Sequence, residues 1–231
     1  MTRMQVDVPT LTQDQLDAFE RDGFVIVRRL VPRDVIDELA PGYDQAVRGE
    51  ITEPSWVQRW KPDWILQLPN PYRNIPSWRG HRYMQLVVGV ARQLLGQDID
   101  YAYDQLIYKP PHNEVEVLWH QDAGYGWRGV ANERSLSCWL ALAPVMRDMG
   151  TMQFIPGSHR HGIFAHHSAK DRNPINGALE VTDLDRAAAV AVEYQPGDAT
   201  FHHGRTLHYT GANTSAHPRR SITTHMWPAD Q

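Results

Sequence analysis

The sequence predicts a mainly β protein that begins with helices, and three observations lead to this prediction. After residue 100 the chain consists of short runs rich in β-branched and aromatic residues, separated by Pro, Gly and Asn. Regular helices are not expected between these runs, which favours an antiparallel sandwich or barrel. Helical spacing of apolar residues is largely confined to residues 1–98. The length of 231 residues suits one domain with a sizeable core.

The helices of the N-terminal portion have recognisable start and stop signals. Thr12 and Gln15 have the spacing of a capping box, which predicts a first helix that ends near Gly23. Pro32 starts a second helix, which we expect to end before Pro41. The other elements expected here are a strand at 24–27 and an amphipathic helix at 81–95.

Residues 55–78 are a candidate lid because their composition is unusual for a connector. They hold four of the eight Trp residues and four Pro. The competing interpretation is that Trp56, Trp60 and Trp64, spaced by four, form one helical stripe packed on the core. Both interpretations keep these rings away from water.

Residues 99–231 are expected to form the β core of a single domain spanning residues 1–231. A short helix is expected only at 183–189. The predicted strands are 101–108, 115–119, 136–142, 152–155, 190–194, 199–202, 205–209 and 221–226.

Composition and charge exclude several classes of function. The formal net charge is −4 and no dense basic stretch is present, so we expect no nucleic-acid partner. The longest apolar runs are far shorter than the roughly 18 residues of a membrane helix, and no export signal is recognisable. Cys138 is the single cysteine and cannot form a disulfide within the chain. We therefore expect a cytoplasmic protein without a membrane partner.

The tripeptide His120-Gln121-Asp122 carries the first chemical signal. Residues two apart on a strand share a face, so His120 and Asp122 can bind one metal ion together. A second imidazole is expected from residues 197–208, where His202, His203 and His208 are candidates. Two His and one carboxylate with three open positions are typical of non-haem Fe(II) oxygenases.

Five stretches then resemble the phytanoyl-CoA dioxygenase family of Fe(II)- and 2-oxoglutarate-dependent oxygenases. In order they are 11–27, Lys-Pro-Pro at 109–111, Trp-His-Gln-Asp at 119–122, Pro-Gly-Ser-His at 156–159, and Pro-Gly-Asp at 196–198 continuing through 219. The resemblance covers nearly the whole chain and implies a double-stranded β-helix, a cupin-like jelly roll. It also implies Fe(II) as cofactor with 2-oxoglutarate and O2 as co-substrates.

The resemblance assigns residues position by position. The metal ligands fall on His120, Asp122 and His208, and the arginine eleven residues beyond the distal histidine falls on Arg219. A guanidinium matches a carboxylate with paired donors, so this residue would bind the distal end of 2-oxoglutarate. Arg220 competes for this role, and a hairpin through 211–218 would bring the arginine back beside its own strand. Thr210 would add a hydroxyl, while Gln105 and Trp139 would line the same pocket, although Trp139 also suits a plain core position.

The substrate is expected to be a small organic metabolite oxidised in a biosynthetic tailoring step by a monomer or homodimer. Substrate-facing candidates are Tyr103, Tyr125, Trp127 and Arg128. Because Asp122 is present where related halogenases have a small residue, hydroxylation or another oxidation such as desaturation or ring formation is favoured. Two alternatives remain: a metal-dependent hydrolase or isomerase, and a catalytically silent binding module.

Overall fold

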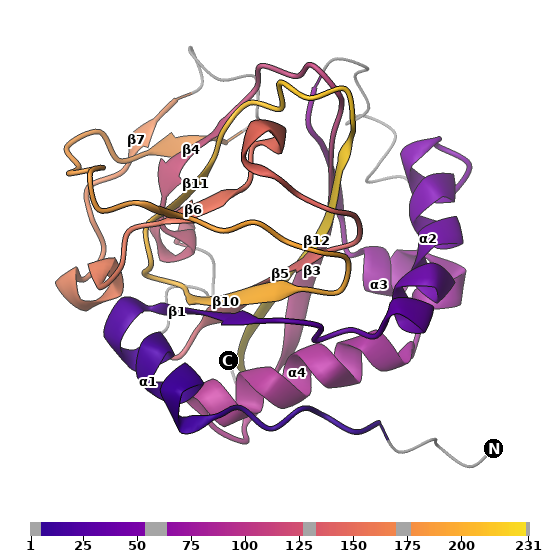
Figure 1. Cartoon of the computed structure of the whole chain (residues 1–231), viewed down its shortest axis with the longest axis horizontal. Coiled ribbons are helices and arrows are strands. Elements are labelled where there is room, and N and C mark those ends of the chain that lie inside the picture. The colour runs from indigo at the N-terminus through magenta and orange to yellow at the C-terminus, as the bar shows by residue number, and fades with distance from the viewer. Residues whose placement is uncertain (1–5, 54–63, 127–132, 170–176, 230–231) are drawn as a thin grey trace.

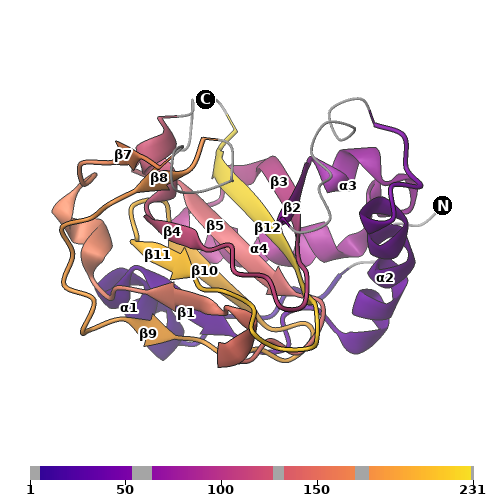
Figure 2. The same ribbon diagram turned by 90° about the horizontal axis from the view of Figure 1, so that it is seen from above.

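Two antiparallel sheets face each other and form the body of the protein (Figures 1 and 2). The computed structural model describes residues 6–53, 64–126, 133–169 and 177–229. Within these ranges, the large sheet has the order β1 (Phe24–Val27), β10 (Ala199–His203), β5 (Leu136–Ala141), β12 (Arg219–Pro228), β3 (Ile99–Lys109), β2 (Leu66–Pro69). The small sheet has the order β4 (Val117–His120), β11 (His208–Thr210), β6 (Met152–Phe154), β9 (Val190–Ala191). A separate pair joins β7 (His167–Ser168) to β8 (Leu179–Glu180). The predicted mainly β class is confirmed.

The helices pack on the large sheet, and α4 runs along its outer face (Figure 1). Their bounds are α1 (Gln13–Asp22), α2 (Arg33–Val47), α3 (Pro71–Asn74) and α4 (Arg82–Leu95), with short 3-10 turns at Pro76–Trp78, Asp122–Tyr125, Arg147–Met149 and Ser158–His161. The predicted capping box is present: the Thr12 side chain accepts from the Gln15 backbone and the Gln15 side chain accepts from the Thr12 N–H. Gly23 ends α1 in the left-handed region at φ 78°. None of the described helices combines the length and apolar composition that a bilayer crossing requires.

The prediction that the second helix ends before Pro41 is wrong, because α2 continues through it to Val47. The helix buries Leu39, Tyr43 and Ala46 on one face, and this packing outweighs the hydrogen bond that Pro41 removes. The indole N–H of Trp78 donates to the Leu39 carbonyl at 3.2 Å. A side chain at position 42 would overlap with that indole, so glycine allows the close approach.

The described part of the candidate lid, residues 64–78, packs into the body of the protein. It contains β2, which pairs with β3, followed by α3 and a 3-10 turn that buries Trp78 completely. Trp56 and Trp60 lie outside the described residues. Whether residues 55–78 act as a lid therefore stays a prediction.

Other predicted bounds also differ from the structure, and three differ most. The strand predicted at 190–194 is confined to β9, Val190–Ala191. Residues 183–189 contain a bend at 183 and a turn at 187–188, and no helix forms where one was expected. The strand predicted from 205 begins only at His208, because residues 203–206 form a turn in which Thr206 N–H donates to the His203 carbonyl at 2.8 Å.

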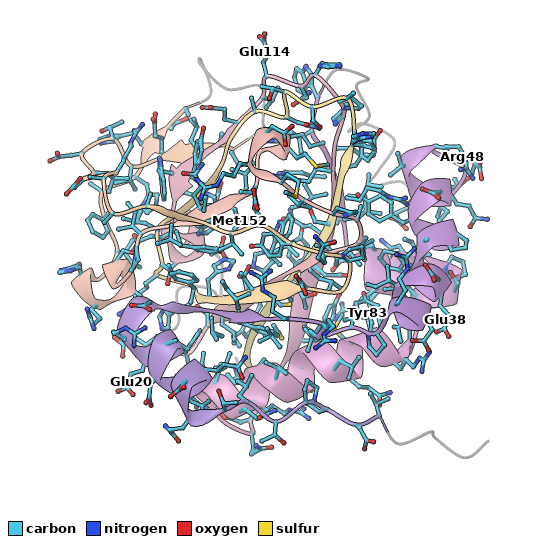
Figure 3. The ribbon with its side chains drawn as sticks, in the orientation of Figure 1. Glu20, Glu38, Arg48, Tyr83, Glu114 and Met152 are labelled. Carbon is cyan, nitrogen blue, oxygen red and sulfur yellow. The ribbon has the colours of Figure 1, made fainter. Side chains whose placement is uncertain are left out.

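Two apolar clusters bury opposite faces of the large sheet. Residues such as Leu106, Cys138 and Phe201 pack with the helices on its outer face. Trp139 and Met152 belong to a second cluster between the two sheets. In Figure 3, Met152 lies among the strands, whereas Glu20, Glu38 and Arg48 project outward from the helices. The space between the sheets also holds the polar side chains described next.

Candidate active site

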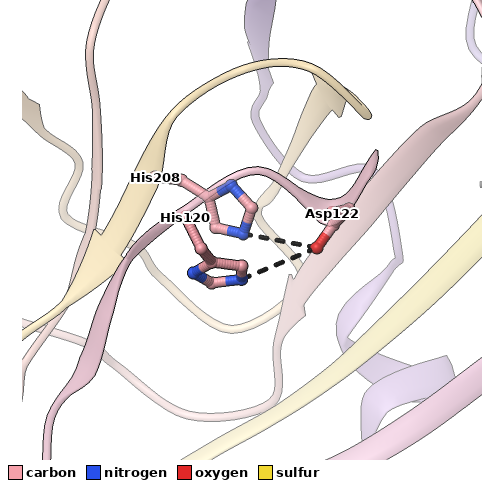
Figure 4. A group of neighbouring side chains, drawn as sticks. All are labelled: His120, Asp122 and His208. Carbon is pink, nitrogen blue, oxygen red and sulfur yellow. Dashed lines mark ion pairs between the residues drawn. The ribbon is translucent and has the colours of Figure 1, made fainter. Parts of the chain in front are cut away.

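Three buried side chains form a group suited to one metal ion. His120 is the last residue of β4, Asp122 begins the following 3-10 turn, and His208 is the first residue of β11. The two histidines are register partners, so their imidazoles lie side by side and both face Asp122 (Figure 4). Their ligand atoms all lie within 4.8 Å of one another. The structure thus brings together the three residues predicted as ligands.

Backbone carbonyls determine which nitrogen each imidazole presents. His120 Nδ1 donates to the Leu118 carbonyl at 2.7 Å, and His208 Nδ1 donates to the Thr206 carbonyl at 2.9 Å. Each Nε2 therefore carries the lone pair and faces the carboxylate, at 3.7 Å from Asp122 Oδ1 for His120 and 3.5 Å for His208. This is the tautomer that a metal ligand needs.

The protonation states also suit a divalent cation. Burial and the neighbouring His208 lower the pKa of His120 to about 3, and burial lowers the pKa of His208 to about 4. Burial alone would raise the pKa of Asp122, but the imidazoles of His208, His202 and His225 outweigh it and hold that pKa well below its usual range. Two neutral imidazoles and one carboxylate are thus ready to bind metal at neutral pH.

Residues from the large sheet surround the other carboxylate oxygen, Asp122 Oδ2. Ser137 Oγ lies 2.6 Å from it, His202 Nε2 3.3 Å and His225 Nδ1 3.7 Å. From the sequence, His202 was only an alternative ligand, and Ser137 and His225 were not predicted. His225 could have been found from the alternation of β12, which places it on the face of Arg219, whereas Ser137 requires the register between strands.

Arg219 lies at the other end of the same cavity, about 1% exposed. Its guanidinium donates to the Gly150 carbonyl and lies over the Trp139 ring, 5.6 Å from the centroid. Within the described part of the chain no carboxylate pairs with it, and its Nε has no hydrogen-bond partner. Burial of a cation without a counter-charge costs free energy, so an anion in the cavity would be favoured beside it.

Arg220 points away from this cavity, as the alternation of a strand requires. Its guanidinium pairs with Asp44 and lies over the Tyr43 ring, 4.6 Å from the centroid. Lys109, the register partner of Arg219, is fully buried and donates to the Gly211 carbonyl. Burial and the charge of Arg219 lower the pKa of Lys109 to about 6, whereas burial lowers that of Arg219 only to about 10. At neutral pH, the positive charge at this end of the cavity is therefore carried by Arg219 rather than by Lys109.

The expected hairpin through 211–218 is wrong. β11 lies in the small sheet between β4 and β6, while β12 lies in the large sheet between β5 and β3. The connection crosses from one sheet to the other, so Arg219 faces the metal group across the cavity.

One cavity of about 240 Å³ joins these groups. The candidates Tyr103, Gln105, Tyr125, Trp139 and Thr210 all line it, as does Gln67 from β2. The candidates Trp127 and Arg128 lie outside the described residues.

The family model "Phytanoyl-CoA dioxygenase (PhyH)" matches residues 19–221. The chain belongs to the phytanoyl-CoA dioxygenase family. A curated relative of this dioxygenase is a probable phytanoyl-CoA dioxygenase of Caenorhabditis elegans, 23% identical over 93% of this chain and 75% of the relative.

Solved structures show the same fold. EvdO2 from Micromonospora carbonacea var. aurantiaca, complexed with 2-oxoglutarate, superposes with a TM-score of 0.79 at 25% identity, covering 96% of this chain and 93% of EvdO2. The 2-oxoglutarate-dependent carbocyclase SnoK from nogalamycin biosynthesis has a TM-score of 0.75 at 23% identity, covering 95% of this chain and 85% of SnoK. The predicted jelly roll is confirmed, and the protein is a non-haem Fe(II)- and 2-oxoglutarate-dependent dioxygenase.

The side chains of this dioxygenase fit its cofactor and co-substrate. The neutral imidazoles and ionised carboxylate match the ligand preference of Fe(II) with open positions. The uncompensated Arg219 matches a carboxylate at the far end of a keto diacid.

Proposed function

We propose that this dioxygenase oxidises an unactivated C–H bond of a small organic metabolite in a biosynthetic tailoring step, with succinate and CO2 as co-products. The observation that carries the proposal is the division of one cavity into three parts. Arg219 provides a cationic end, His120, Asp122 and His208 provide the metal group, and the remaining described lining is uncharged apart from its histidines.

The first two parts serve the co-substrate. We assign His120, Asp122 and His208 as Fe(II) ligands, and Arg219 with Thr210 as the site for the distal carboxylate. Gln105 and Trp139 also line the cavity, which supports their assignment to the 2-oxoglutarate pocket. Bound Fe(II) and 2-oxoglutarate supply the activation of dioxygen, and the chain supplies orientation and a largely water-free cavity.

The third part receives the substrate. Beside Tyr103 and Tyr125, its described walls contain aliphatic side chains of β3, β4 and β8: Ile107, Val117, Leu118 and Leu179. The cavity of about 240 Å³ would also hold 2-oxoglutarate, which leaves limited room beside the metal for the reacting group of the substrate. These features support a neutral, moderately sized substrate over a large acyl thioester.

The ligand set favours hydroxylation, desaturation or ring formation over halogenation. Asp122 is a carboxylate among the residues that could hold the metal, and as a ligand it would leave no room for a halide at that position. The carbocyclase SnoK, which shares the fold, is named for a ring-forming reaction in nogalamycin biosynthesis. This neighbour supports a role in tailoring.

An anaerobic titration with Fe(II) and 2-oxoglutarate tests the co-substrate roles. We expect the visible charge-transfer band of the chelate, and an Arg219→Ala variant should need more 2-oxoglutarate to reach it. Turnover is then measured with a library of neutral small organic metabolites, and we expect succinate together with a product 16 mass units heavier or 2 units lighter. Turnover that is undiminished without 2-oxoglutarate would instead indicate a hydrolase.

A further inference from the structure

The carboxylate of Asp122 has two oxygens in different surroundings. Oδ1 faces the Nε2 atoms of His120 and His208. Oδ2 faces Ser137 Oγ at 2.6 Å and His202 Nε2 at 3.3 Å. Only one oxygen is therefore directed to the space between the two imidazoles.

The groups around Oδ2 come from the opposite sheet. Ser137 on β5 is the register partner of His202 on β10 and of His225 on β12. Three adjacent strands of the large sheet thus converge on a residue that follows β4 of the small sheet. Because strands in a sheet hold their side chains in fixed register, this contact fixes the carboxylate relative to both sheets.

The direction of the hydrogen bonds shows that Ser137 donates to the carboxylate of Asp122. An ionised carboxylate only accepts hydrogen bonds, so the hydroxyl of Ser137 donates to Asp122 Oδ2. The serine oxygen then accepts from His225 Nδ1 at 2.8 Å. His225 therefore donates to Ser137, and Ser137 donates to Asp122.

Among the described residues, Asp122 is the polar partner that explains the position of His202. It is about 1% exposed, and its ring packs 5.4 Å from the Phe154 ring and 4.5 Å from the His208 ring, centroid to centroid. Neither ring nitrogen makes a hydrogen bond of good geometry to any described residue. Burial of an imidazole costs free energy unless a polar contact compensates, and Asp122 Oδ2 is the polar atom beside it.

We propose that Ser137, His202 and His225 form a clamp on Asp122 Oδ2, so that the carboxylate binds the metal through Oδ1 alone. The three are positioning residues, and the inference rests on Asp122 being an Fe(II) ligand. Bound through one oxygen, Asp122 would use a single metal position and would leave the others to the keto acid and dioxygen. Partners behind metal ligands typically change metal affinity or activity by about 10- to 100-fold.

Variants of His202 and Ser137 test the clamp with Fe(II) as the probe. His202→Phe keeps the ring shape without nitrogen, whereas His202→Gln keeps a donor near the position of Nε2. We expect His202→Phe and Ser137→Ala to lower Fe(II) affinity by about tenfold or more and to weaken the charge-transfer band with 2-oxoglutarate. His202→Gln should recover much of both.

Thr200→Val is the matched control. Thr200 lies two residues before His202 on the same face of β10, is fully buried, and its hydroxyl lies 3.0 Å from Tyr194 Oη. This variant should lose stability while it binds Fe(II) as the wild type does.

Each outcome supports or overturns the clamp. Wild-type Fe(II) affinity and band intensity in both His202→Phe and Ser137→Ala would overturn it, as would an equal loss in Thr200→Val. If His202→Phe does not fold, Ser137→Ala decides. Failure of the wild-type protein itself to bind Fe(II) would overturn the proposed function rather than the clamp alone.

Discussion

His208 shows how a single residue is selected from a run of candidates. His202, His203 and His208 fall within one segment, yet only His208 has its Nε2 facing Asp122 Oδ1 with its Nδ1 held by a backbone carbonyl. His203 lies outside the cavity, where its Nε2 donates to the Glu133 carbonyl at 2.7 Å.

A comparison of His208→Ala with His203→Ala tests this selection. His208→Ala should abolish detectable Fe(II) binding because one of three ligands is lost, whereas His203→Ala should retain it. Binding is measured by anaerobic titration, and circular dichroism checks that both variants are folded. The ligand assignment is wrong if the two variants behave in the opposite way.

Arg219 and Arg220 form the second comparison at this scale. Arg219→Ala should raise the KM for 2-oxoglutarate by about 10- to 100-fold, since a charge-assisted pair contributes about 1.5–3 kcal/mol. Arg220→Ala removes an ion pair with Asp44 on the outer side and should leave that KM nearly unchanged. An unchanged KM in Arg219→Ala would move the role to Lys109 or Arg220.

At the scale of elements, the sequence predicted features that depend on neighbouring residues better than features that depend on contacts between distant parts of the chain. The capping box of Thr12 and Gln15 was predicted correctly because both partners lie within one turn. The continuation of α2 through Pro41 was not, because it depends on contacts with Trp78, a residue far along the chain. The crossing from β11 to β12 was also missed, since a short polar connection between two strands suits a hairpin as well as a change of sheet.

The turn at Gly150 contacts Arg219, the proposed residue for the distal carboxylate of 2-oxoglutarate. Gly150 has φ 66°, and its carbonyl accepts from the Arg219 guanidinium. A Cβ at this position would overlap with the carbonyl oxygen of Gly211. Gly197 offers a matched control, because it has φ 87° and its Cβ would overlap with the carbonyl oxygen of Val31, where no co-substrate residue is assigned.

Gly150→Ala and Gly197→Ala should both lower the free energy of unfolding, by about 1–3 kcal/mol each. Only Gly150→Ala should also weaken 2-oxoglutarate binding, because the displaced turn moves the acceptor that orients Arg219. Urea unfolding and the titration of the charge-transfer band measure the two effects. Equal 2-oxoglutarate affinity in both variants would contradict the role of this turn.

At the scale of the whole molecule, the active site is assembled from two sheets. The small sheet and the 3-10 turn after β4 supply the proposed metal ligands, and the large sheet supplies Arg219, Trp139 and the proposed clamp on Asp122. Sequence motifs could identify the ligands because His120 and Asp122 are two residues apart. Ser137 carries no motif, and its contact with Asp122 arises only when the sheets face each other. A site of this kind requires the folded structure, so its metal affinity and the stability of the fold are coupled.

This coupling predicts how pH affects metal-dependent stability. In the folded, metal-free protein, burial lowers the pKa of His120 to about 3 and that of His208 to about 4, whereas in the unfolded chain both are near 6.5. Between pH 7 and 5.5 the unfolded imidazoles therefore take up protons that the folded ones do not. The metal-free protein should lose about 1 kcal/mol of stability for each histidine over this interval.

The gain from metal should nevertheless stay constant over the same interval, because the folded ligands remain unprotonated and protons do not compete with the ion. With Mn(II) at about 100 times its Kd, binding adds about 2.7 kcal/mol, or about 5–10 °C in melting temperature. Thermal unfolding at pH 7.0 and 5.5, with Mn(II) and with a chelator, measures both trends. A gain that disappears at pH 5.5 would show that the two imidazoles titrate like exposed histidines, and the buried ligand geometry would then be wrong.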